Sequence, residues 1–140
     1  MLSFTSSAVT TSEAASYVDD RALAGWPADE PAQMAALRRG QDHIAREYNG
    51  RWDEEWESDD APDLVRFAII EAAVVEARNP GSLSPAVKAS EAKMLTGVGS
   101  ISWSPIQGPA GVEALRPRLL HVEAMLAPVL RSRAIFLERA

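Results

Sequence analysis

The sequence predicts a mainly α-helical protein: a helical bundle of about four helices with a protruding β-hairpin or extended arm, then a C-terminal helix and a tail. Apolar residues recur at helical spacing in three stretches before residue 80 and again after residue 115. Between them, a run punctuated by glycine at 93–103 alternates as a strand does. With 140 residues the chain has the size of one domain. We therefore predict a single domain, with a helical body at 1–92, a β-arm at 93–107 and a C-terminal helix with a docking tail at 108–140.

The first two helices are predicted to begin at recognisable caps. The hydroxyl of Thr10 or Thr11 can cap the first helix, and Asp29 followed by Pro31 announces the second. Gly40 lies inside the apolar stripe of the second helix, where glycine costs about 1 kcal/mol relative to alanine. This cost indicates that a neighbouring backbone approaches closely at Gly40.

The third helix is predicted to begin at Pro62 and is apolar nearly all round as far as Ala77. A bundle of this size can hardly surround one helix completely, so part of its surface is expected to contact another subunit. A central core helix within a monomer is the alternative. The oligomer-contact residues assigned on this helix are Phe67, Ile70 and Val74.

The arm is predicted to be completed by other copies of the chain. Ile101 and Trp103 alternate as strand residues do, and an isolated hairpin is barely stable in water. Neighbouring copies in a ring can supply the missing edge hydrogen bonds. The oligomer-contact residues assigned on the arm are Val98, Ile101 and Trp103.

A final helix is predicted from the helical spacing of apolar residues between Leu115 and Val129. The segment from Leu130 to Ala140 then places an apolar triplet among arginines. Exposure of three consecutive apolar side chains to water is unfavourable, which indicates that the segment docks on a partner. A frayed terminus is the ordinary alternative. The docking residues assigned there are Arg131, Arg133, Ile135, Phe136 and Leu137.

Six acidic residues crowd the loop at 53–60, between the second and third helices. The loop is either a solvated surface or a wall that faces a channel and repels DNA phosphates. Trp52 and Trp56 lie in the same loop, and either fold back onto the core or contact another subunit. The candidate channel-facing residues are Asp53, Glu54, Glu55 and Glu57.

Composition excludes several classes of function. The chain has no cysteine, so neither disulfides nor thiolate metal sites are available. Its net charge of -6 argues against a protein that binds nucleic acid over much of its surface, because affinity for the phosphate backbone depends on Lys and Arg. No apolar run approaches the roughly 20 residues that cross a bilayer, and the first residues lack the pattern of a signal peptide. We expect no membrane partner.

The sequence contains no convincing catalytic, cofactor or metal site, and we expect a protein that is not an enzyme and needs no cofactor. His43 and Glu47 share a helix face but lack a third metal ligand, so a surface ion pair is the expected role. His121 is expected to be a satisfied polar packing residue. The run Gly97-Val98-Gly99-Ser100 lacks the third glycine and the Lys-Ser/Thr pair of a phosphate loop.

Several stretches occur in a characteristic order. SEAASYVDDR at 12–21 precedes a tryptophan, and MAALRRGQDHI at 34–44 leads through Tyr48 to Trp52. The long helix and the arm follow, and MLAPVLR at 125–131 comes last. In this order and spacing, over most of its length, the chain resembles the head-to-tail connector (adaptor) proteins of long-tailed bacteriophages. Some relatives in that family are labelled DnaT-like putative single-stranded DNA-binding proteins.

The resemblance implies a helical subunit in a ring, commonly of twelve copies, between the portal protein and the tail stopper or terminator. DNA would pass non-specifically through the channel of this ring. The implied location is the neck of the virion, after synthesis in the cytoplasm of the bacterial host. The C-terminal segment from Leu130 is implied to reach the portal. The loop after Trp52 departs from the family, because it is unusually acidic and lacks an alanine-tryptophan-proline-arginine type of segment.

A single-stranded DNA-binding replication accessory protein is the alternative function. Aromatic side chains would stack on bases and arginines would contact phosphates. The acids beside two of the tryptophans count against it. The residues concerned are Trp52, Trp56 and Trp103 for stacking, and Arg38, Arg39 and Arg46 for the phosphates.

Overall fold

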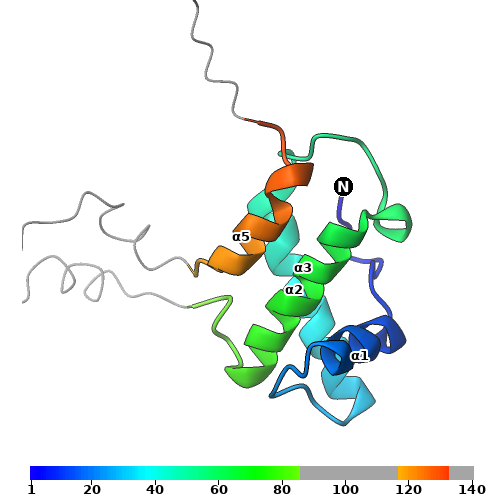
Figure 1. Ribbon diagram of the computed structural model, residues 1–140, viewed down its shortest axis with the longest axis vertical. Coiled ribbons are helices and arrows are strands. Elements are labelled where there is room, and N and C mark those ends of the chain that lie inside the picture. Colours follow the sequence, from blue (N-terminus) through cyan, green and yellow to red (C-terminus); the bar gives the residue numbers. More distant parts are fainter. Residues whose placement is uncertain (86–116, 133–140) are drawn as a thin grey trace, which may run out of the picture. The chain divides into compact units, whose positions relative to one another are not determined.

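The computed structural model describes residues 1–85 and 117–132. The described residues are mainly helical, which confirms the predicted class, and they contain no strand beyond one isolated bridge (Figure 1). The predicted arm at 93–107 lies outside the described residues. The helices are α1 (Thr11–Asp20), α2 (Glu30–Tyr48), α3 (Asp63–Arg78) and α5 (Leu120–Leu126), with short 3-10 helices η1 (Ser58–Asp60) and η3 (Ala127–Val129).

The chain divides into two compact units. The first, which we call the body, comprises Met1–Leu83 and Leu119–Ala140, and it contains all the helices named above. The second comprises Ser84–Arg118, of which residues 84–85 and 117–118 are described. Every contact reported below lies within the body.

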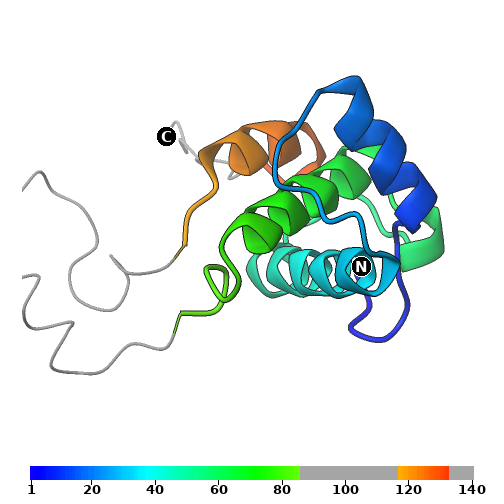
Figure 2. The same ribbon diagram turned by 90° about the horizontal axis from the view of Figure 1, so that it is seen from below.

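Helices α2 and α3 approach each other closely at Gly40, as the glycine inside the helix predicted. They form the most extensive helix–helix contact of the body and lie side by side in Figures 1 and 2. A Cβ added at Gly40 would lie 2.7 Å from the Ala73 nitrogen and 2.7 Å from the Ile69 oxygen, both backbone atoms of α3. Glycine permits this approach because it has no side chain to separate the helices.

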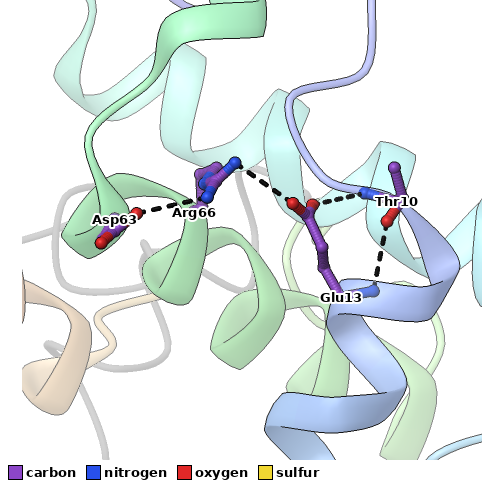
Figure 3. Close-up of polar contacts among 4 residues, drawn as sticks. All are labelled: Thr10, Glu13, Asp63 and Arg66. Atoms are coloured by element: carbon purple, nitrogen blue, oxygen red, sulfur yellow. Dashed lines mark hydrogen bonds and ion pairs between the residues drawn. The ribbon is translucent and has the colours of Figure 1, made fainter.

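Helix α1 begins at a capping box. The Glu13 N–H donates to Thr10 Oγ1 at 3.1 Å, and the Thr10 N–H donates to Glu13 Oε2 at 3.0 Å. The Glu13 carboxylate also pairs with Arg66 of α3 at 3.2 Å, and Arg66 contacts Asp63 at 3.2 Å (Figure 3). One glutamate therefore caps α1 and ties it to α3. Of the two predicted caps, Thr10 is the one that the structure uses.

Helix α3 is the central helix of the body, and its apolar surface is largely covered within the chain. It contacts α1, α2 and α5, and Ile70 and Val74 each keep only 2% of their surface exposed. This burial corrects the assignment of Ile70 and Val74 to an oligomer interface, because neither retains surface for another subunit. The short helix α5 contributes the fully buried Val122 to the same core. Phe67 is only partly buried, and its ring centroid lies 5.0 Å from that of Tyr17.

The segment before α1 is held to the body by two side-chain amides. Gln41 of α2 is buried, accepts a hydrogen bond from the Ala8 N–H at 2.9 Å and donates to the Ser3 oxygen at 2.6 Å. Asn49 accepts from the Leu2 N–H at 3.0 Å and donates to the Leu2 oxygen at 2.9 Å. The buried Leu2 side chain therefore belongs to the core.

Glu76 of α3 fixes the turn at which the body leads into the second unit. The residue is only 3% exposed, so its carboxylate needs partners inside the body. Arg39 of α2 pairs with Oε1 at 3.0 Å, and the N–H groups of Gly81 and Leu83 donate to the carboxylate at 2.8 and 3.3 Å. These three donors satisfy the buried charge and give the turn a defined position on α3.

Candidate functional site

The loop between α2 and α3 meets the segment after α5 at one end of the body (Figure 1). The Asp53 N–H donates to the Val129 oxygen at 3.0 Å, and the Arg131 N–H donates to the Arg51 oxygen at 2.8 Å. These bonds form an isolated antiparallel bridge at Trp52. The start of the C-terminal tail is therefore fixed against the loop.

The two tryptophans of this loop have different environments. Trp52 is 4% exposed, and its indole N–H donates to Asn49 Oδ1 at 3.0 Å. The centroid of its ring lies 6.0 Å from that of Tyr48 and 5.0 Å from that of Trp56. Trp56 packs against the core but is only partly buried. The sequence left two roles open for this pair, packing onto the core or contact with another subunit. Trp52 packs onto the core.

A hollow of about 460 Å³ lies beside Trp56, and we call it the Trp56 hollow. It brings together residues that were assigned from the sequence to two separate roles, namely the acids of the loop and the first arginine of the tail. This juxtaposition follows from the bridge at Trp52, which holds the tail against the loop. The lining includes Trp52, Glu54, Glu55, Trp56, Glu57 and Arg131.

The carboxylates of the loop lack ionic partners within the part of the chain that the structure describes. The ion pairs among those residues lie elsewhere, and none involves any of the six acids at 53–60. The described residues also contain no group of three or more donors that could hold a metal ion. The Trp56 hollow therefore presents three carboxylates beside an aromatic wall, together with Arg131 and Met1, whose ammonium group donates to the Trp56 oxygen.

The other residues assigned from the sequence lie outside the described ranges. On the tail, the described part ends shortly after Arg131, which is exposed. On the arm, no assigned residue is described. The residues concerned are Arg133, Ile135, Phe136 and Leu137 of the tail, and Val98, Ile101 and Trp103 of the arm.

A separate polar cluster joins three helices around Glu71 of α3. The Tyr17 hydroxyl of α1 donates to Glu71 Oε1 at 2.7 Å, and His121 Nε2 of α5 lies 3.5 Å from Glu71 Oε2. Burial raises the pKa of Tyr17 to about 12, and the hydrogen bond to Glu71 and the charge of Glu71 add to the shift. The Arg21 guanidinium lies 3.7 Å from the centre of the Tyr17 ring. The cluster ties α1 and α5 to α3, a role for Tyr17 and Glu71 that no sequence pattern signalled.

His43 is buried, which corrects the expected surface ion pair with Glu47. Only 4% of the residue is exposed, because its face of α2 lies inside the body. Burial lowers the pKa of His43, with the nearby charge of Arg46 acting in the same direction and the carboxylates of Glu47 and Glu76 opposing it. A neutral imidazole is therefore the form that the folded body favours.

No family model, curated protein or solved structure matches the chain. Among the described residues, no helix combines the length and apolar content that a bilayer crossing requires. The function is therefore inferred from the order of the sequence features and from the geometry of the body.

Proposed function

We propose that the chain is a structural subunit of a bacteriophage head-to-tail connector (adaptor) ring. Copies of the chain, commonly twelve in such rings, would lie between the portal protein and the tail stopper or terminator. DNA would pass through the channel without specific contacts, and the subunit would perform no catalysis. The ring would belong to the neck of the virion, after synthesis of the subunit in the host cytoplasm. The order and spacing of the sequence stretches support this proposal.

One observation carries the proposal: the body closes its own core, and the two segments assigned to partner contacts begin at two separate, fixed places in it. Leu83, held by Glu76, precedes the second unit, and the tail begins at the bridge beside Trp52. After the second unit, the chain forms α5 and η3 before the tail begins. The helical residues 120–129 place the start of α5 and the start of the tail roughly 15 Å apart. Two segments that begin at different, fixed places of a firm body can contact two different partners, as a connector must.

The finer parts of the predicted architecture have roles within this proposal. The segment 93–107 forms a β-hairpin or extended arm that adds strands to neighbouring copies. Phe67, which keeps part of its surface, contacts a neighbouring subunit, and the tail from Leu130 docks on the portal. The acids of the loop were predicted to line the channel. Because they lie beside the aromatic wall of the Trp56 hollow, a contact with a partner protein is favoured for them over a purely channel-lining role.

Single-stranded DNA binding, the alternative function, has less support. Trp52 is buried and cannot stack on a base unless the loop unfolds. Arg39 is paired with the buried Glu76, and Arg38 donates to the backbone of the segment before α1 at 3.1 Å. Trp56 is partly exposed, but the carboxylates around it repel phosphates.

The mass of the purified chain, alone and mixed with portal rings from the same phage, tests the proposal. We expect either rings of many copies or a monomer that joins the portal. Binding to labelled single-stranded DNA should be weak, because the net charge of -6 opposes contact with phosphates. A chain that forms no ring, does not join portals and binds DNA tightly with a steep salt dependence would refute the proposal.

A further inference from the structure

We propose that the Trp56 hollow binds an extended, arginine-bearing segment of a protein partner. The identity of that partner, a neighbouring component of the neck, rests on the proposed function, whereas the chemistry of the hollow does not. Three properties of the hollow support the inference: its charge, its aromatic wall and its backbone frame.

The charge of the hollow selects a cationic ligand. Glu54, Glu55 and Glu57 line it without an ion-pair partner in the described ranges, and they outnumber the two cationic groups of the lining, Arg131 and the Met1 ammonium. A guanidinium can donate two parallel hydrogen bonds to one carboxylate, so several carboxylates on one loop suit a segment with several arginines. A metal ion fits less well, because the described residues hold no cluster of three donors for it.

The aromatic wall favours arginine over lysine. The partly exposed Trp56 ring lies 5.0 Å from the ring of Trp52, whose burial fixes its position. A guanidinium can stack on an aromatic face while its N–H groups bond carboxylates, which an ammonium cannot do in the same way. The body already contains such a stack, between Arg21 and Tyr17 at 3.7 Å. Arg131 of the same chain lines the hollow, so an arginine side chain is accommodated beside these acids.

The size and frame of the hollow suit a peptide. Its volume of about 460 Å³ lies within the range of roughly 300–1,000 Å³ that is usual for ligand sites. Trp52 and Arg131, which both line it, belong to the two segments that the bridge joins, so this part of its wall is positioned before any partner arrives. Nucleic acid is a poor occupant, because the same carboxylates repel its phosphates.

Fluorescence anisotropy with a labelled peptide of alternating glycine and arginine, applied to the full chain, tests this inference. Binding should weaken about tenfold or more in the triple variant Glu54→Gln, Glu55→Gln, Glu57→Gln, because the charge-assisted hydrogen bonds are lost. A peptide with lysine in place of arginine should bind several-fold more weakly. The three substituted residues are exposed, so the variant is expected to fold, which circular dichroism checks.

A matched control removes the same charge elsewhere on the body, with Asp19→Asn, Asp20→Asn and Glu30→Gln at exposed positions of α1 and α2. At physiological salt, where charges are screened over about 8 Å, its affinity should stay within about twofold of the unchanged chain. Equal weakening in the two triple variants would show attraction by bulk charge and overturn the inference. Absence of peptide binding to the unchanged chain, or displacement of the peptide by oligothymidylate, would also overturn it.

Failure of this inference and failure of the connector proposal give different results. A chain that forms rings or joins portals but does not bind the arginine peptide would refute the role of the hollow alone. A chain that binds the peptide through the hollow but never assembles would refute the connector and retain the hollow as a binding site.

Discussion

Replacement of Gly40 by alanine is expected to destabilise the body by about 2 kcal/mol or more, although alanine is the better helix former. The added Cβ would lie 2.7 Å from each of two backbone atoms of α3, and a backbone cannot rotate away as a flexible side chain can. Helices α2 and α3 must therefore separate, which weakens the packing along their contact. Chemical denaturation followed by far-ultraviolet circular dichroism measures the loss.

Ala35 provides the control, because it is exposed on the same helix. Ala35→Gly should cost about 1 kcal/mol, the ordinary difference in helix propensity. If the close approach of the helices were unimportant, Gly40→Ala would gain a similar amount. A Gly40→Ala variant as stable as the unchanged chain, or more stable, would contradict the close contact.

Removal of the Trp52 side chain is expected to cost about 3–5 kcal/mol of unfolding free energy, whereas Trp56→Ala should cost about 1 kcal/mol. Trp52 is 4% exposed and donates to Asn49, so its loss leaves a cavity and removes one of the two hydrogen bonds that Asn49 Oδ1 accepts. Trp56 is only partly buried and has less packing to lose. Thermal unfolding of the two variants and of Trp52→Phe compares these costs.

The Trp52 prediction has a second readout at the tail. Leu130 forms its bridge with Trp52, so Trp52→Ala should also release the start of the tail. Trypsin should then cut after Arg131 faster in Trp52→Ala than in Trp56→Ala under conditions where both remain folded. Equal stability losses, together with equal cleavage, would contradict the division of the pair into a core residue and a surface residue.

Local signals in the sequence predicted local structure well. Asp29 and Pro31 mark the start of α2, Thr10 caps α1, and Gly40 marks the close helix contact. Each of these signals depends on a backbone constraint that holds whatever the rest of the chain does: a free N–H to cap, a fixed φ or a missing Cβ. They can therefore be recognised before the partner of each segment is known.

Burial was harder to predict, because it depends on which distant segments cover a helix. Ile70 and Val74 were expected at an interface, but they are buried in a body where α3 contacts α1, α2 and the distant α5. The sequence predicts a surface ion pair for His43, yet its face of α2 is packed inside the body. Gln41 interrupts the apolar stripe of α2 because its amide bonds the segment before α1. No local pattern announces these long-range contacts.

The candidate site was predicted only in pieces. The acids of the loop and Arg131 of the tail were both singled out, but for different roles. Their meeting in the Trp56 hollow depends on a backbone bridge between residues 52 and 130, which are far apart in the sequence. A pair of backbone hydrogen bonds leaves no signature in residue types, so the composition of the hollow became apparent only in three dimensions.

If the body folds by itself and the segment 93–107 joins the copies, a double substitution in that segment should separate folding from assembly. Ile101→Asp with Trp103→Asp would place charge where strands of neighbouring copies must pair. Native mass and circular dichroism, recorded on the same samples with and without portal rings, give both readouts. We expect an unchanged helical signal and loss of the multi-copy assembly. Assembly that persists in the double variant, or a helical fold that is lost with it, would contradict this account.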